Sequence, residues 1–208
     1  LEHGVMSYMS KLLQDSSQGV ERIGEIILTL KNFSRLDRAK VSEFNVREGL
    51  DSTLLIAHNF LKNKVRVEKE FEEIPHITCS PSQINQVFLN LISNAAQAIP
   101  DGRQGVLTLR TFPKGGDSVC IEIQDNGSGI PAKILPKIFD PFFTTKEIGK
   151  GTGMGLSISY KIITEHGGTI SVDTEEEIGT VFSIELPVAP QEKAADSDLE
   201  EDSVLLAA

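Results

Sequence analysis

The sequence predicts an α+β fold, a two-layer α/β sandwich preceded by a long N-terminal helix. Short strands of alternating polarity recur between residues 41 and 188, and two well-marked amphipathic helices lie among them. An apolar stripe in steps of three and four runs through the first 38 residues and predicts the preceding helix. We therefore expect a helical segment over 1–38, a folded body over 39–189 and an acidic disordered tail over 190–208.

Composition and charge exclude several classes of protein. Apolar residues make up 39% of the chain and charged residues 24%, which is near the globular average. The net charge is −10, of which residues 191–208 supply −5, so the body lacks the clustered cations of a nucleic-acid-binding surface. No apolar run approaches the length of a membrane helix, and no signal peptide opens the chain. Cys79 and Cys120 lie in no metal-binding motif and indicate core thiols in a reducing compartment.

The N-terminal segment is expected to form one helix, about 50 Å long at 1.5 Å per residue. It can fold back on the body, or it can form a seam with a partner helix. We favour the seam because Ser16, Gly19 and Gly24 weaken the helix and make it depend on packing. The stripe consists of Met9, Leu13, Val20, Ile23, Ile27 and Leu30.

Short strands and turns make up much of the body. Phe182, Ile184 and Leu186 share one face of the last strand, as alternation predicts for a half-buried sheet. Strands are expected over 43–46, 64–71, 76–79, 105–112, 118–125, 168–173 and 180–187.

A helix is expected to begin after residue 80. Ser80 is the predicted N-cap, Pro81 occupies the first helical position and Gln83 follows the cap by three residues. The helix is expected to end at Pro100-Asp101-Gly102. Its apolar stripe comprises Ile84, Val87, Phe88, Leu91, Ile92, Ala95 and Ile99.

Three amide side chains follow one flank of this helix. Gln86, Asn90 and Asn94 are spaced by four residues, so their side chains stack along the helix axis. Asparagine is unfavourable inside a helix, and two of them one turn apart indicate that the amides bind something. A polar flank in contact with water is the alternative, and this segment alone does not decide between them.

A carboxylate is expected at the end of a buried strand. Val119, Ile121 and Ile123 face the core, and Asp125 has the same parity. A buried carboxylate needs a donor; the adenine 6-amino group supplies one, whereas guanine presents an acceptor oxygen. The glycines of Asn126-Gly127-Ser128-Gly129 allow a flat ligand to approach the backbone. An ordinary hairpin turn is the alternative interpretation.

A second glycine cluster, Gly149-Lys150-Gly151-Thr152-Gly153-Met154-Gly155-Leu156, opens another helix. Free backbone N–H groups at a helix N-terminus attract phosphate, although this is neither a Walker A loop nor a Rossmann fingerprint. We expect a lid that Phe139, Phe142 and Phe143 fasten to the body, with Lys146 as the cation within reach of phosphates. A solvated loop with a few anchoring aromatics is the alternative.

Four motifs occur in a fixed order: Gln86 to Ala95, Asp125 to Gly129, Phe139 to Lys146, and Gly149 to Leu156. With the closing strand Gly179-Thr180-Val181-Phe182, they resemble the catalytic ATP-binding domain of bacterial sensor histidine kinases. The wider family includes type II topoisomerase ATPase subunits and DNA mismatch-repair ATPases. The resemblance implies the Bergerat fold, a mixed sheet backed by helices with ATP held under a lid.

The resemblance also implies roles for individual residues. Asn90 would coordinate Mg²⁺ through its carbonyl, and Asn94 would support the phosphates. Asp125 would accept a hydrogen bond from adenine N6, and Gly127 and Gly129 would admit the ring. Asn90 and Lys146 are the expected catalytic residues. Further nucleotide contacts are implied for Gln86, Lys146, Gly151, Gly153, Gly155, Leu156 and, through water, Thr180.

Two features set the expected mechanism. Many relatives have glutamate where this chain has Gln86, and an amide cannot act as a general base. The segment 5–37 looks like the second helix of the family's dimerisation hairpin, but His3, His58, His76 and His166 lack the context of a phosphoacceptor. The phosphoacceptor is therefore expected outside this chain.

The leading hypothesis is a histidine kinase fragment that binds Mg²⁺ and ATP and transfers the γ-phosphoryl group to a histidine. An ATP-operated clamp and a non-catalytic nucleotide-sensing scaffold are the alternatives. The expected partners are a second copy through the N-terminal helix and a response regulator receiver domain, with no nucleic acid and no membrane contact by this fragment. The fragment is expected in the cytoplasm, whether or not its parent protein is membrane-anchored.

Overall fold

The computed structural model describes residues 40–62, 64–146 and 151–189. The predicted N-terminal helix over 1–38 and the tail over 190–208 lie outside the described residues. All seven expected strands are present, with ends shifted by up to two residues. The elements in order are β1 (Ser42–Phe44), α2 (Val46–Leu61), β2 (Val65–Phe71), β3 (Ile77–Cys79), α3 (Pro81–Ala98), β4 (Gly105–Lys114), β5 (Ser118–Asp125), η2 (Leu135–Lys137), α4 (Gly155–Glu165), β6 (Thr169–Glu175) and β7 (Gly179–Pro187).

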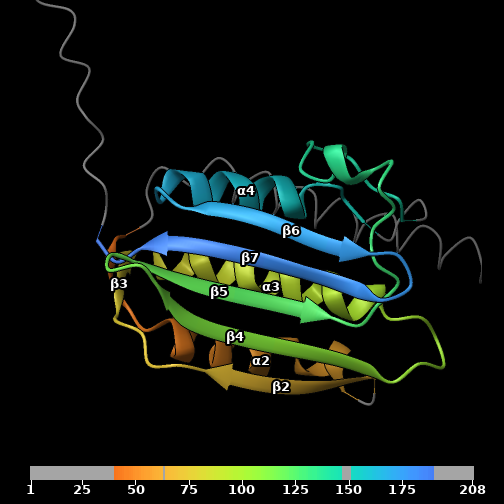
Figure 1. Cartoon of the computed structure of the whole chain (residues 1–208), viewed down its shortest axis with the longest axis horizontal. Helices are drawn as coiled ribbons and strands as arrows, with labels where there is room; N and C mark the ends of the chain where they lie inside the picture. Colours follow the sequence, from red (N-terminus) through yellow and green to blue (C-terminus); the bar gives the residue numbers. More distant parts are fainter. Residues whose placement is uncertain (1–39, 63, 147–150, 190–208) are drawn as a thin grey trace, which may run out of the picture.

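Five of the strands form one mixed sheet in the order β2-β4-β5-β7-β6. β2 runs parallel to β4, and the other neighbouring pairs are antiparallel. β1 and β3 make a separate antiparallel pair. Figure 1 shows α2, α3 and α4 on one face of the five-stranded sheet, which confirms the predicted two-layer α+β sandwich.

The core lies between the sheet and the three helices, and α3 is at its centre. α3 packs against α2 and α4, and it also contacts β4 and β5. The predicted apolar stripe of α3 and the inward-facing residues of β5 and β7 are buried, as their periodicity indicated. Cys79 and Cys120 are buried free thiols, as expected.

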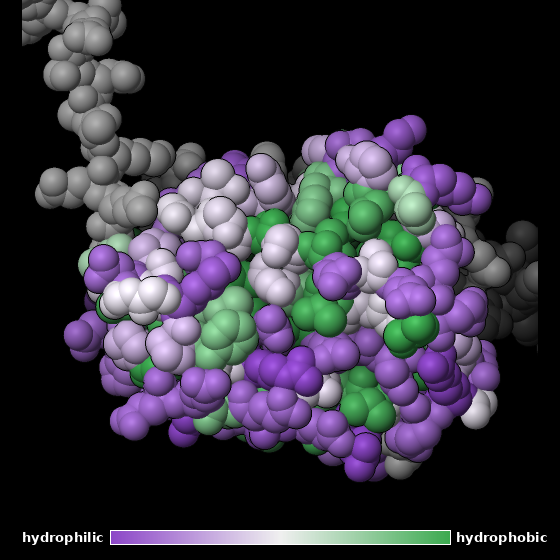
Figure 2. Space-filling model, viewed as in Figure 1, coloured by the Kyte–Doolittle hydropathy of each residue, from purple (hydrophilic) through white to green (hydrophobic). Residues whose placement is uncertain are grey.

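The opposite face of the sheet carries charged side chains. Arg110 on β4 pairs with Glu70 on β2 at 2.5 Å and with Glu122 on β5 at 3.6 Å, and Arg66 pairs with Glu68 at 2.7 Å. Figure 2 shows this face, with hydrophilic residues predominating over β2 and β4. Among the described residues a helix layer therefore covers only one face of the sheet, and residues that bind a ligand between the layers must point to that side.

The helix α2 was missing from the sequence prediction. Its N-cap is Asn45, whose side-chain oxygen accepts hydrogen bonds from the backbone N–H groups of Arg47 and Glu48. The Asn45 amide also donates to the Glu48 carboxylate at 3.0 Å, so the two residues form a reciprocal cap. Residues 43–46 alternate like a strand, and this pattern concealed the cap.

The predicted cap of α3 is only partly correct. Ser80 occupies the N-cap position and Pro81 the first helical position, but the Ser80 side chain makes no capping hydrogen bond. Its backbone N–H instead donates to the His166 ring at 3.0 Å, and its hydroxyl lies 3.3 Å from that of Ser82. The start of α3 is thus fixed through the C-cap residue of α4.

This difference between the two caps predicts different mutational effects. Asn45→Ala removes the acceptor of two backbone N–H groups and should lower the free energy of unfolding by about 1 kcal/mol. Ser80→Ala removes no such acceptor and should have a smaller effect, so it is the matched control in urea unfolding monitored by circular dichroism. Equal losses in the two variants would contradict the assigned cap.

None of the helices in the described ranges combines the length and apolar character that a membrane span requires.

Candidate functional site

A buried carboxylate lies at the end of β5. Asp125 is 5% exposed, and its Oδ1 accepts the backbone N–H of Gly127 at 2.7 Å. Burial raises the pKa of Asp125 to about 6, against opposing backbone hydrogen bonds from Gly127 and Thr180. The predicted inward orientation is correct. This carboxylate has no cation partner among the described residues, so a neutral donor group can satisfy it.

The glycines after Asp125 are required by the fold itself. A Cβ on Gly127 would lie 2.7 Å from the Ala98 carbonyl oxygen, and one on Gly129 would lie 2.2 Å from the Glu175 carbonyl oxygen. Gly129 also has a φ of +67°, which favours glycine. The turn is therefore pressed between the end of α3 and the β6–β7 hairpin, which fixes the position of Asp125.

Asn90 connects α3 to the first turn of α4. Its Nδ2 donates to the Gly155 carbonyl oxygen at 3.1 Å and to the Ser159 hydroxyl at 3.3 Å. These two bonds orient the amide, and the carbonyl oxygen is the end of Asn90 that can bind a ligand. Ser159 was not predicted, because a small polar residue within a helix gives no distinctive signal in the sequence.

Lys146 lies against the amide flank of α3. Its Nζ donates to the side-chain oxygen Oδ1 of Asn94 at 3.0 Å and makes a short hydrogen bond to the side-chain oxygen Oε1 of Gln97. Burial lowers the pKa of Lys146. Gln97 was also missed, although it follows Asn94 by three residues on the same flank. The structure therefore brings the predicted cation to the predicted amides.

These groups form a line along α3. Asn90 lies near one end, and Ala98, which contacts the turn after Asp125, lies at the other. Eight residues of helix separate Asn90 from Ala98, a rise of about 12 Å along the helix axis. Gln86 lies one turn before Asn90 on the same flank.

The remaining predicted residues lie around this line. Gly155 is the first residue of α4 and approaches Asn90, with its Cβ position 3.7 Å from the Asn90 side chain. Leu156 is half-buried against the core. The Gly151 Cβ position lies 3.0 Å from the Lys146 side chain. Thr180 is buried, and its hydroxyl lies 3.1 Å from that of Thr174 on the neighbouring strand.

The prediction that three phenylalanines fasten the expected lid to the body is wrong for one of them. Phe139 and Phe143 pack against the core, but Phe142 is 67% exposed and has a φ of +67°. A Cβ on Gly153 would lie 2.4 Å from the Phe142 carbonyl carbon, and Gly153 itself has a φ of +68°. The backbone at Phe142 packs against glycine, and its ring consequently turns outward.

Comparisons with known proteins support an ATPase of one family. Residues 79–190 match the family model described as histidine kinase-, DNA gyrase B- and HSP90-like ATPase. Sensor kinase CckA of Brucella abortus is 36% identical over 88% of this chain and 21% of its own length. Sporulation kinase E of Bacillus subtilis is 39% identical over 81% of this chain and 23% of its own length. The chain thus spans less than a quarter of these two relatives.

Solved structures show the same fold. The catalytic domain of histidine kinase ThkA matches with a TM-score of 0.64 and 32% identity, over 73% of this chain and 97% of that one. ThkA in complex with the response regulator protein TrrA matches with a TM-score of 0.67 and 27% identity, over 84% of this chain and 50% of that one.

The raised pKa of Asp125 predicts a pH-dependent stability. Because burial favours the protonated acid, its contribution to the free energy of unfolding is fully present below the unfolded pKa near 4 and is lost as pH rises through about 6. The loss should be about 3 kcal/mol at neutral pH.

Urea unfolding between pH 4 and 8 measures this contribution as the difference in the free energy of unfolding between the native chain and Asp125→Asn, whose side chain cannot ionise. The difference should change in favour of Asp125→Asn as pH rises. A constant offset across this range would show that Asp125 has an ordinary pKa in the folded state.

Proposed function

The chain belongs to the family of histidine kinase-, DNA gyrase B- and HSP90-like ATPases, and on that basis we propose that it is the ATP-binding kinase domain of a sensor histidine kinase. In this proposal it transfers the γ-phosphoryl group of ATP to a histidine nitrogen on a separate helix hairpin. One observation carries the proposal: a buried carboxylate lies beside the C-terminal end of α3, and oriented side-chain amides follow the same helix.

Asp125 selects the base. The ionised carboxylate accepts the adenine 6-amino group, while the Gly127 N–H continues to donate to its Oδ1. Guanine would place a carbonyl oxygen against the same carboxylate, and two acceptors repel each other. Adenine nucleotides are therefore preferred over guanine nucleotides at this site.

Neutral amides and one lysine receive the phosphates. Asn94 and Gln97 already hold Lys146 close to α3, where its ammonium group neutralises phosphate charge. Backbone N–H groups at Gly155 and the start of α4 add partial positive charge from the helix N-terminus. This set suits a polyphosphate because it combines a cation with donors that need no counterion.

The residues present also fit Mg²⁺. No cluster of three or more His, Cys, Asp or Glu side chains in the described part of the chain could hold a metal by itself. Mg²⁺ usually takes few protein ligands and keeps phosphate oxygens and water in its shell, and the oriented carbonyl of Asn90 is a suitable single ligand. When bound, the ion would neutralise negative charge on the phosphates.

The protein's part in the transfer is positioning. A nitrogen–phosphorus bond forms as the bond between the γ-phosphorus and the β–γ bridging oxygen breaks, and ADP leaves. Lys146 and the amides hold the phosphates in line, while Gln86 can orient a neighbouring group but cannot accept a proton. The same limitation weighs against an ATP-operated clamp, which needs a group that activates water.

The acceptor and the partners come from outside the described residues. His166 is fully used in the fold, because Nε2 accepts the Ser80 N–H and Nδ1 lies 2.7 Å from the Ile162 carbonyl oxygen. A hairpin histidine in a dimer formed through the N-terminal helix is the proposed acceptor. A response regulator receiver domain is the proposed next partner, in keeping with the ThkA complex.

The base preference yields one prediction. Asp125→Asn places an amide against the adenine amine and should weaken ATP binding roughly 10- to 100-fold, the effect of losing a hydrogen bond to a charged group. Isothermal titration with ATP and GTP should also show a smaller preference for ATP. Asp117→Asn changes an exposed acid in the turn before β5, at the opposite end of that strand from Asp125, and is the matched control. Unchanged ATP affinity in Asp125→Asn would refute the base site.

The phosphoryl transfer yields another prediction. With labelled ATP, Mg²⁺ and a separately supplied hairpin that contains the upstream histidine, the chain should form an acid-labile label on the hairpin. Asn90→Ala should reduce this label about 100-fold or more, because it removes the metal ligand and the tie to Gly155. Asn59→Ala on the exposed side of α2 is the control.

Circular dichroism of Asn90→Ala would confirm that the variant is folded. ATP binding without transfer to the hairpin by the native chain would favour the nucleotide-sensing scaffold over the kinase.

A further inference from the structure

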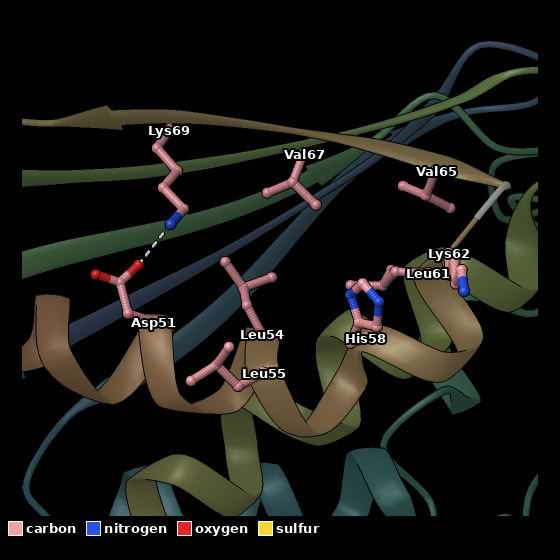
Figure 3. A pocket seen from close by; sticks show the side chains of 9 residues that line it. All are labelled: Asp51, Leu54, Leu55, His58, Leu61, Lys62, Val65, Val67 and Lys69. Carbon is pink, nitrogen blue, oxygen red and sulfur yellow. Dashed lines mark hydrogen bonds and ion pairs between the residues drawn. The ribbon is translucent and has the colours of Figure 1, made fainter.

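A groove separates α2 from the edge strand β2, on the far side of the sheet order from β6. Its volume is about 430 Å³, and its apolar lining comes from Leu54, Leu55 and Leu61 of α2 and from Val65 and Val67 of β2. Figure 3 shows Leu54 of α2 and Val67 of β2 pointing toward each other across the space between the two elements. In the described residues β2 pairs only with β4, so its other edge is open.

The apolar surface continues from the groove onto α2. Leu55 is 79% exposed, Ile56 67% and Phe60 40%, and no described residue covers them. Ile56 and Phe60 are one turn apart and share a flank of the helix. A helix of a soluble domain rarely leaves three large apolar residues together in water, and such a patch indicates a contact surface.

The rim of the groove carries two lysines and one acid, Lys62, Lys69 and Asp51, although the chain as a whole is acidic. Lys69 crosses one end of the groove and pairs with Asp51 at 2.6 Å (Figure 3). At the other end Lys62 lines the groove beside His58 and has no carboxylate partner within the described residues. Lys64 follows in the turn and has only a 3.8 Å contact with the exposed Asp101. The chemistry of the groove therefore suits a segment that is both acidic and apolar.

We propose that the C-terminal tail of this chain, residues 190–208, docks in the groove between α2 and β2. The tail contains six acids and one base, followed by the apolar triplet Val204-Leu205-Leu206. The triplet displaces water from the apolar lining, and the acids lie beside Lys62, whose charge no described carboxylate neutralises. The N-terminal residues 1–39 contain five acids and five bases and offer no such charge complementarity.

The tail is long enough to reach the groove. The described chain leaves β7 at Val188, whose N–H donates to Asp117 and whose carbonyl accepts the Thr78 N–H. β7 and β2 are three strand spacings apart, about 14 Å, and strand register places Val65 about 30 Å further along the sheet. The diagonal is roughly 33 Å, whereas the fifteen or so residues up to Val204 span about 50 Å when extended.

A nitroxide on the tail tests this docking in the full chain. The label is attached through Ser203→Cys, because Cys79 and Cys120 are buried and burial raises the pKa of both thiols. The methyl signals of the groove leucines and valines should lose at least half of the intensity that they have after the nitroxide is reduced. The methyl signals of Ile158 and Ile162 on α4 should keep theirs.

Variants show which interactions hold the tail. In the spin-labelled chain, Leu205→Ser/Leu206→Ser should restore the groove signals, and Lys62→Glu should reduce the paramagnetic relaxation at least threefold. Lys133→Glu makes the same charge change at an exposed site away from the groove and should have no effect. Salt at 0.5 M should weaken the docking, because rim charges are screened.

Several outcomes would overturn the proposal. Groove signals that keep their intensity, or that are equally broadened in Leu205→Ser/Leu206→Ser, would mean that the tail does not occupy the groove. In a second sample, spin-labelled chains without isotopes are mixed with isotope-labelled native chains that carry no spin label. Broadened groove signals in this mixture would mean that the tail of a second copy occupies the groove. Broadening confined to α4 would place the tail elsewhere.

Discussion

Among the described residues the fold places one carboxylate in a buried position without a cation partner, and the proposed site is built around that constraint. Asp125 is held by the backbone N–H of Gly127, and the glycine turn that supplies this donor is packed between α3 and the β6–β7 hairpin. In the proposed site an adenine amine would complete the hydrogen bonding of the carboxylate without a full opposite charge. Burial makes the ionised carboxylate costly in the free protein, and it would make the carboxylate selective toward such a donor.

The helix α3 packs into the core with one face and presents the proposed site residues on another. Its apolar stripe forms the centre of the core, which fixes its rotation against the sheet. The flank beside the stripe then presents Asn90, Asn94 and Gln97 in a row toward α4 and Lys146. Because core packing sets the rotation of the helix, the positions of the amides follow from the apolar pattern.

Periodicity predicted much of this arrangement, and contacts between distant segments account for the rest. Alternation in β5 correctly placed Asp125 in the interior, and the spacing of four correctly aligned the amides of α3. The start of α2 was missed because Asn45 follows a strand-like pattern and its cap depends on a reciprocal bond with Glu48. Ser80 does not cap α3 because His166 engages its backbone N–H, and Phe142 turns outward because Gly153 packs on its backbone. Such long-range contacts leave no local trace in the sequence.

The charge of the chain also bears on the composition of the proposed phosphate end of the site. The net charge is −10, and basic residues such as Arg66 and Arg110 are paired with acids on the outer sheet face. Neutral amides and backbone N–H groups attract phosphate through dipoles and bring no counterion with them. In the proposed site Lys146 would be a sufficient cation for the phosphates, because the side chains of Asn94 and Gln97 orient its ammonium group from a helix that the core holds in place. In the proposed site, oriented dipoles and one lysine among the described residues would release the nucleotide after transfer more readily than a cluster of fixed positive charges.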